Sequence, residues 1–220
     1  MGATAEEADV QDGGTIRARV ERALGARIAA GLEPEGALLT VPVLAERYRV
    51  SATPVREAML ELQRRGFVEP ARNRGFVVTA VDPAHAQHVA AVRELLEPPA
   101  MRTVAGLRAE APWARAGAAR IAEAAAAGDL EDYLEEDRRF HVELTALAGN
   151  PMLTAVVDDL RRRTRLPGLT ALVGTRELAA SAAEHGDLLD AIEAGHEDAA
   201  ERVMRHHIGH TTGWWAGRPE

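Results

Sequence analysis

The sequence predicts a mainly α-helical protein of two domains, and three observations support this. Apolar residues recur at three- and four-residue spacing through most of the 220 residues, which is the period of an amphipathic helix. The period changes to that of a strand between residues 67 and 79. A basic segment, with 11 Arg against 7 Glu in residues 15–80, is joined to an acidic remainder. We therefore expect a small module with a β-hairpin, followed by an all-helical bundle.

Composition excludes several classes of protein. The chain has no Cys, so it contains no disulfide framework and no thiolate metal site. Hydrophobic residues make up 46% and charged residues 27%, as in a globular chain. No apolar run approaches the roughly 18 residues of a membrane span. We expect a cytoplasmic protein that does not bind membranes, with a disordered tail over residues 1–14, which carry four acids and no base.

Residues 15–80 are expected to form three helices in sequence. The first covers residues 16–31, and a turn at 33–36 precedes a short helix around Leu44. The third helix is strongly amphipathic and covers residues 55–65, directly after a proline that the first turn of a helix tolerates.

A β-hairpin follows these helices. Strands are expected at residues 67–69 and 76–79, on either side of a basic tip at residues 71–75. Three helices followed by a two-stranded wing form a winged helix-turn-helix, in which the third helix enters the major groove of DNA.

The polar residues of this domain lie where contact with double-stranded DNA requires them. Arg suits this role because its planar guanidinium makes paired hydrogen bonds with phosphates and guanine edges. A solvated helix face is the alternative for any single Arg, but helix order, hairpin and charge together favour DNA. The expected DNA-binding residues are Ser51, Thr53, Arg56, Arg72, Asn73, Arg74 and Gly75.

The same residues carry a family resemblance. The run from Ser51 to Val78, SATPVREAMLELQRRGFVEPARNRGFVV, resembles the GntR family of bacterial transcription regulators, with its S-R-T-P-V-R-E-A-L run and its R-G-x-x-V wing. Two positions depart from the family pattern. Ala52 replaces the usual Arg, and Pro42 stands where many relatives carry a basic residue. The operator sequence therefore does not follow from the resemblance.

The second domain, residues 82–215, begins at the helix start Asp82-Pro83 and contains no segment with a strand pattern. Its helices are expected at residues 84–108, 114–127, 129–149, 151–165, 176–194 and 196–213.

Polar side chains interrupt the apolar faces of three of these helices. Asp137 and His141 lie four residues apart, so both project to the same side about 6 Å apart along the axis. His185 and His207 lie ten residues before and twelve after Gly195, so an antiparallel hairpin brings them to one height. Ionisable groups in a helical core need a partner, because an unpaired buried charge costs several kcal/mol.

A divalent metal ion is the simplest partner for these four residues. Imidazole and carboxylate suit Zn above all, with Ni, Mn or Fe as alternatives, and such a site leaves coordination positions for water or a ligand. The competing interpretation makes each His a hydrogen-bonded core residue, and for any one of them alone we would favour it. His210 could substitute as a ligand, while the remaining histidines are expected at the surface.

The helical domain also resembles the FCD effector domain of the FadR-like branch of GntR regulators. The matching segments are DRRFHVELTALAGNP at 137–151, EHGDLLDAIEAG at 184–195 and MRHHI at 204–208. The resemblance implies that Asp137, His141, His185 and His207 occupy the family's metal positions.

Two further residues could face an effector in this domain. VRELLE at 92–97 resembles the family's R-x-x-L-E run, so Arg93 either binds an effector carboxylate or pairs with Glu97 at the surface. Asn150 either lines the pocket or caps the helix that begins at Pro151, and the cap is favoured.

The sequence thus predicts a homodimeric repressor that binds operator DNA and releases it when a small carboxylate binds beside the metal. Two alternatives stay open. A metal-dependent enzyme is the first, although no general base is evident unless Glu143 or Glu184 faces the site. A DNA-binding protein with a purely structural metal and no effector is the second.

Overall fold

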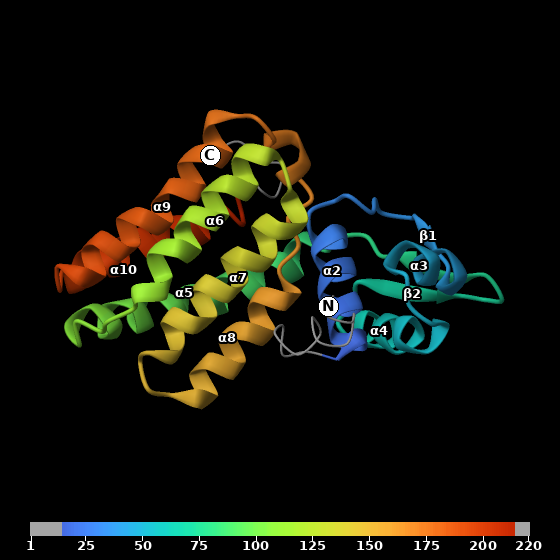
Figure 1. Ribbon diagram of the computed structural model, residues 1–220, viewed down its shortest axis with the longest axis horizontal. Coiled ribbons are helices and arrows are strands. Elements are labelled where there is room, and N and C mark those ends of the chain that lie inside the picture. The colour runs from blue at the N-terminus through green and yellow to red at the C-terminus, as the bar shows by residue number, and fades with distance from the viewer. Residues whose placement is uncertain (1–14, 214–220) are drawn as a thin grey trace, which may run out of the picture. The chain divides into compact units, whose positions relative to one another are not determined.

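The computed structural model describes residues 15–213, and the expected tail at residues 1–14 lies outside that range. The chain divides into two compact units, whose described parts are residues 15–25 with 33–80, and residues 26–32 with 81–213. Helices dominate both units, and a small sheet lies in the first (Figure 1). The predicted fold class is confirmed. No helix in the described part of the chain is long and apolar enough to cross a membrane.

The first unit is a three-helix module with a sheet. One face of its third helix is fully apolar, since Val55, Met59 and Leu62 are all buried there. The described elements are α2 (Ile16–Ala29, whose last residues belong to the second unit), β1 (Leu38–Leu39), α3 (Val41–Tyr48), α4 (Ala52–Arg64), β2 (Val68–Ala71) and β3 (Gly75–Val78).

The wing contains one strand more than the sequence predicted. β1 pairs antiparallel with β3, with Leu38 opposite Val77, so the sheet order is β1-β3-β2. A two-residue strand is too short to show an alternating pattern, and for that reason the sequence did not reveal it. Gly75 makes the close approach possible, because a Cβ there would lie 2.3 Å from the carbonyl oxygen of Leu39.

The turn between α3 and α4 sets the orientation of the third helix. Arg49 ends α3 in the left-handed region, with φ 56°, and its N–H bonds to the carbonyl oxygens of Ala45 and Glu46. Ser51 is the N-cap residue of α4, although its side chain makes no capping hydrogen bond. The helix begins at Ala52, three residues earlier than expected, so that Pro54 lies in its first turn.

The second unit is a helical bundle, and its described residues contain no strand. Its core includes Tyr133 and Phe140 of α7 and Leu188 of α9, each 1% exposed or less. The elements are α5 (Pro83–Gly106), α6 (Pro112–Ala127), α7 (Leu130–Ala146), α8 (Pro151–Arg163), the 3₁₀ turn η1 (Leu169–Leu172), α9 (Arg176–Glu193) and α10 (Glu197–Gly209).

The hairpin of α9 and α10 positions two of the predicted metal ligands. Its turn contains Gly195 at φ 71°, where a Cβ would lie 2.8 Å from Nε of Arg108. The two helices pack side by side (Figure 1), and His185 on one and His207 on the other bring their ring centroids within 4.8 Å.

Candidate metal centre and DNA-binding surface

Four side chains from three helices converge inside the second unit. Asp137 and His141 come from α7, His185 from α9 and His207 from α10, and their ligand atoms all lie within 4.8 Å of one another. The Nε2 atoms of His141 and His185 are 3.1 Å apart. Oδ1 of Asp137 lies 3.1 Å from Nε2 of His185, 3.4 Å from that of His207 and 3.7 Å from that of His141.

These separations fit a shared metal ion. Donors bound at about 2.0–2.1 Å to a tetrahedral Zn²⁺ stand about 3.3–3.4 Å apart, and the four measured distances bracket that value. Two imidazole nitrogens that face each other at 3.1 Å also need at least one of them to be unprotonated. One carboxylate oxygen and three nitrogens on a common point form a donor set for a borderline divalent metal.

Outer contacts orient two of the imidazole rings. Nδ1 of His185 donates to the carbonyl oxygen of Ala182 at 3.0 Å, which leaves the lone pair of Nε2 facing the centre. Nδ1 of His207 donates in the same way to Oε2 of Glu184 at 2.9 Å. Nδ1 of His141 is buried and has no hydrogen-bond partner among the described residues.

The pKa shifts favour the metal-binding form of three of the four donors, and a metal would have to displace a proton from the fourth, His207. Burial alone would raise the pKa of Asp137, but the positive charge of the Arg161 guanidinium beside it holds that pKa well below its usual range. Burial, reinforced for His141 by the charge of Arg161, lowers the pKa of His141 and His185, so both rings are neutral near pH 7. Burial would lower the pKa of His207 too, but hydrogen bonds to Asp137 and Glu184 raise it instead.

A buried chain of ion pairs leads away from the centre. Arg161 of α8 donates through Nη1 to Oδ2 of Asp137 at 2.8 Å and through Nε to Oε2 of Glu97 at 2.9 Å. Oε1 of Glu97 accepts from Nε of Arg93 at 2.6 Å. The sequence patterns of the helical domain did not predict a role for Arg161. It lies four residues after the buried Val157, and that helical spacing is the signal that could have found it.

The structure corrects one interpretation of Arg93. The pair with Glu97 forms, but inside the unit rather than at its surface, because Arg93 is 3% exposed and Glu97 is 1% exposed. Nη1 of Arg93 also donates to Oγ1 of Thr164 at 3.2 Å. Arg93 therefore belongs to the same buried network as Asp137.

Asn150 lies at the start of α8, where its side-chain oxygen accepts from the backbone N–H groups of Met152 and Leu153. It is exposed and acts as a helix cap in this structure. His210 is buried, and its Nε2 lies 2.8 Å from Oε1 of Glu184. Its ring also packs edge-on against that of His207, with the centroids 6.2 Å apart. The exposed histidines are His85, His88, His196 and His206.

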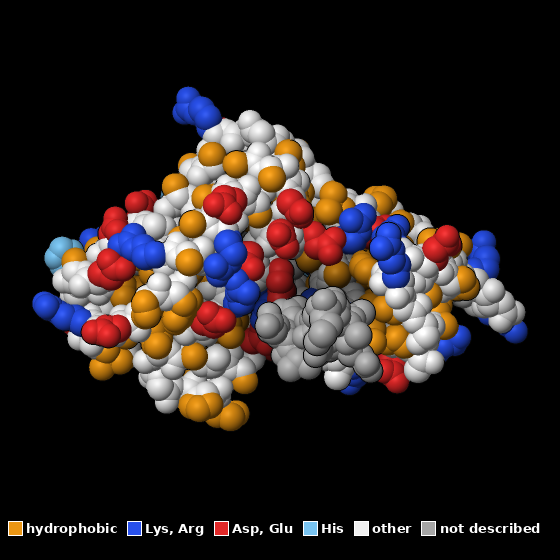
Figure 2. All heavy atoms as spheres, in the orientation of Figure 1, with side chains coloured by type: hydrophobic (Ala, Val, Ile, Leu, Met, Phe, Trp, Pro, Cys, Tyr) orange, Lys and Arg blue, Asp and Glu red, His pale blue; other side chains and the backbone are white. Residues whose placement is uncertain are grey.

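The predicted DNA-binding residues fall into two exposed groups. Ser51, Thr53 and Arg56 are exposed at the start of α4, and Arg72 to Arg74 form the tip of the hairpin, with Asn73 in the left-handed region. Basic side chains are visible at the end of the unit that the hairpin tip reaches (Figure 2). Gly75 is half-buried behind the tip.

Ion pairing distinguishes these arginines from others in the same unit. Arg47 pairs with Glu33, and Arg65 pairs with Glu21 at 2.8 Å. Arg56, Arg72 and Arg74 make no ion pair with any described residue. Three exposed guanidinium groups are therefore available for phosphates or base edges.

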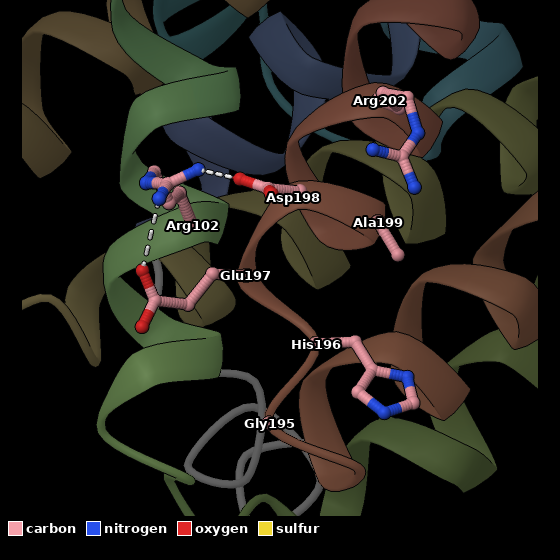
Figure 3. A pocket seen from close by; sticks show the side chains of 7 residues that line it. All are labelled: Arg102, Gly195, His196, Glu197, Asp198, Ala199 and Arg202. Atoms are coloured by element: carbon pink, nitrogen blue, oxygen red, sulfur yellow. Dashed lines mark hydrogen bonds and ion pairs between the residues drawn. The ribbon is translucent and has the colours of Figure 1, made fainter.

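An open hollow of about 480 Å³ lies elsewhere in the second unit. It is lined by Arg102 of α5 and by the start of α10, and none of the four converging residues borders it (Figure 3). Arg102 already pairs there with Glu197 and Asp198. The four converging residues are buried donors, and this hollow is a separate surface feature.

Comparisons with protein families match both units. The model described as bacterial regulatory proteins, gntR family, matches residues 16–78, and the model of the FCD domain matches residues 88–210. Both matches agree with the resemblances seen in the sequence.

Individual relatives extend these matches over most of the chain. A protein of Streptomyces ambofaciens, named an uncharacterized HTH-type transcriptional regulator in an unstable DNA locus, is 32% identical over 180 residues, 79% of this chain and 73% of that one. The HTH-type transcriptional repressor RspR of Escherichia coli is 25% identical over 200 residues, 88% and 86% of the two chains. The solved structure of E. coli McbR/YncC has the same fold, with a TM-score of 0.73 at 23% identity over 90% of this chain and 95% of that chain.

Proposed function

Because this chain belongs to the GntR family of bacterial regulatory proteins and is a DNA-binding transcription regulator, we propose that it is a repressor controlled by a small organic acid. In this proposal the acid binds beside a divalent metal ion in the helical domain, residues 82–215, and lowers the affinity of the winged helix for its operator. The observation that carries the proposal is the convergence of Asp137, His141, His185 and His207 on one point.

The metal would be held by these four residues, with Zn favoured and Ni, Mn or Fe as alternatives. When bound, it supplies a positive charge and open coordination positions for a carboxylate. Ala182 orients the ring of His185 with Nε2 unprotonated, and Glu184 orients the ring of His207. Arg161 turns Asp137 so that Oδ1 faces the histidines.

The buried arginines give an incoming acid its second attachment. Arg93 and Arg161 bind the two different oxygens of Glu97, so one carboxylate compensates two guanidinium groups there. A carboxylate that enters the network can accept paired hydrogen bonds from one edge of the planar guanidinium group of Arg93. This exchange shifts α5 against α8, and it controls DNA binding because the acid binds the two arrangements unequally.

DNA is read by α4 in the major groove, with Ser51, Thr53 and Arg56 at its exposed start, while the wing tip contacts the backbone. A homodimer presents two such modules to two half-sites. Exposed apolar side chains on α5 and α8 support a dimer, since Leu95 and Met152 are each 73% exposed. Operator binding places the protein in the cytoplasm.

We rank an enzymatic role second. Glu184 is an acid outside the four that contacts one of them, His207, so it is the residue to consider as a general base. Its two oxygens contact His207 and His210. The role of Glu184 is therefore to orient the metal ligand His207. We therefore propose that the protein is not an enzyme.

The deciding experiment uses the untagged full chain and a duplex selected by it from a random library. Fluorescence anisotropy would follow release of this duplex on titration with a panel of small carboxylates, with and without a chelator. We expect release by some carboxylate, loss of that response on chelation, and loss of both metal and response in His185→Ala. Metal binding with no response to any carboxylate would instead favour a purely structural metal.

A further inference from the structure

We propose that Glu184, His206 and His210 form a second, outer site for a transition-metal ion. Nε2 of His210 lies 2.8 Å from Oε1 of Glu184, and Nε2 of His206 lies 3.3 Å from the same oxygen. The three ligand atoms lie within 4.8 Å of one another. None of these three residues belongs to the inner set of Asp137, His141, His185 and His207.

Helix geometry explains why the three residues meet. His206 and His210 lie four residues apart at the end of α10, so their rings share one face, with centroids 4.8 Å apart. Glu184 comes from the neighbouring α9, which packs against α10. Two histidines one helical turn apart and a carboxylate from an adjacent helix supply three of the four ligands of a tetrahedral metal site.

The chemistry of the donors selects the ion. Two imidazoles and one carboxylate suit Zn²⁺, Ni²⁺, Co²⁺ or Cu²⁺ and disfavour Mg²⁺ and Ca²⁺, which need more oxygen ligands. The site is reachable from solvent, because the side chain of His206 is 65% exposed while that of Glu184 is 13% exposed. With three protein ligands, one of them exposed at the surface, the outer site binds its ion more weakly than the four-donor inner site.

One carboxylate links the two sites. Glu184 offers Oε1 to the outer pair, while its Oε2 accepts from Nδ1 of His207, an inner ligand, at 2.9 Å. Removing Glu184 therefore takes a ligand from the outer site and a supporting hydrogen bond from the inner one, whereas removing His206 affects the outer site alone.

The test is metal titration of the untagged, metal-stripped full chain with Zn²⁺ as the probe, measured by elemental mass spectrometry after equilibrium dialysis at fixed free Zn²⁺. The wild type is expected to bind two ions per chain in a tight and a weaker step. His206→Ala changes an exposed position and should leave the affinity of the tight step unchanged. It should lower the affinity of the weaker step by more than about 100-fold, because loss of a contact that only supports a ligand costs about 10–100-fold. Glu184→Gln should weaken both steps.

Two further variants separate this inference from the inner site. His185→Ala should lose the tight step and keep the weak one. His196→Ala removes an exposed histidine outside both sets and should leave two ions bound. A wild type that binds one ion at every free Zn²⁺ concentration, or a second ion that His206→Ala does not affect, would show that the three residues form a hydrogen-bonded cluster only. Either result would overturn the outer site and leave the inner one untouched.

Discussion

Arg161 donates through Nη1 to Oδ2 of Asp137 at 2.8 Å, and the other carboxylate oxygen of Asp137 faces the three histidines. The side chain of Arg161 is 3% exposed, so its charge is compensated within the protein rather than by water. The pair thus both orients a metal donor and fixes α8 against α7. Its second partner, Glu97, extends the same network to α5.

We expect Arg161→Leu to lower the free energy of unfolding of the metal-free protein by about 3–5 kcal/mol, because it leaves Glu97 and Asp137 buried with fewer compensating charges. Urea denaturation followed by circular dichroism measures this. Arg163→Leu on the same helix is the matched control, since its pair with Asp159 is partly exposed and should be worth about 0–1 kcal/mol. Equal effects of the two changes would contradict the assigned role of Arg161.

We expect protonation of Glu97 to contribute to the loss of stability at acidic pH. Burial would raise the pKa of Glu97, but the charges of Arg161 and Arg93 lower it below its ordinary value of 4.5. The unfolded chain therefore takes up this proton first as the pH falls. The stabilisation by Glu97 is complete above about pH 4.5 and is lost as the pH falls through the lower folded-state pKa.

Unfolding free energies of the chelated protein, measured from pH 7 down to about pH 3, test this directly. Glu97→Gln should be less stable at pH 7 and should lose stability less steeply below about pH 4.5 than the wild type. Glu123→Gln, at an exposed position on α6, should leave the wild-type profile unchanged. An unchanged acid slope in Glu97→Gln would assign the acid sensitivity to other carboxylates.

Two variants of Asn150 distinguish its role as a helix cap from a role in binding the effector. Its side chain accepts from two backbone N–H groups of α8, so Asn150→Ala should cost about 1 kcal/mol of stability. Asn150→Asp keeps the capping oxygen and should retain that stability. Thermal shifts with carboxylates provide the second measurement. If Asn150 lined the pocket, the added negative charge of Asn150→Asp would weaken carboxylate binding, whereas a cap predicts no change.

The sequence predicted the helices of the second unit and the four converging donors because helix and turn geometry follow from spacing along the chain. Helical spacing relates residues four apart, and the turn at Gly195 relates His185 to His207 by chain length alone. Arg161 escaped prediction because an arginine in a charged run, RRR at 161–163, is usually solvated. Which of the three points inward depends on packing against α5 and α7, and composition does not show that.

Exposed apolar residues make the expected dimer testable. Leu95 on α5 and Met152 on α8 are each 73% exposed, and a charge in a buried subunit interface is costly. We expect Leu95→Glu and Met152→Glu to shift sedimentation equilibrium from dimer to monomer and to weaken operator binding. Leu107→Glu, also at an exposed position at 61%, lies at the far end of α5 and should remain dimeric. A wild type that sediments as a monomer would contradict the dimer itself.

Gly75 tests whether the wing contributes to DNA affinity through its shape. Its φ of 132° lies in a region that side chains rarely adopt, and a Cβ would stand 2.3 Å from the carbonyl oxygen of Leu39, a backbone atom that is held in the sheet. Gly75→Ala should therefore separate β1 from β3 and displace Arg72 and Arg74 at the tip. Gly36→Ala supplies the control, because Gly36 also has positive φ, 78°, but has nothing within 4 Å of an added Cβ.

Both changes should cost about 1 kcal/mol or more for the backbone conformation, and Gly75→Ala should cost clearly more because it adds a steric clash. Anisotropy titrations with the selected duplex should show weaker binding for Gly75→Ala and nearly unchanged binding for Gly36→Ala. Comparison with Arg72→Ala separates shape from charge. Loss of one phosphate contact reduces the salt dependence of binding by about one unit of slope. A displaced wing in Gly75→Ala should reduce that slope further, because Arg72 and Arg74 would both lose their contacts with the DNA backbone. Wild-type affinity and slope in Gly75→Ala would show that the wing does not contact DNA.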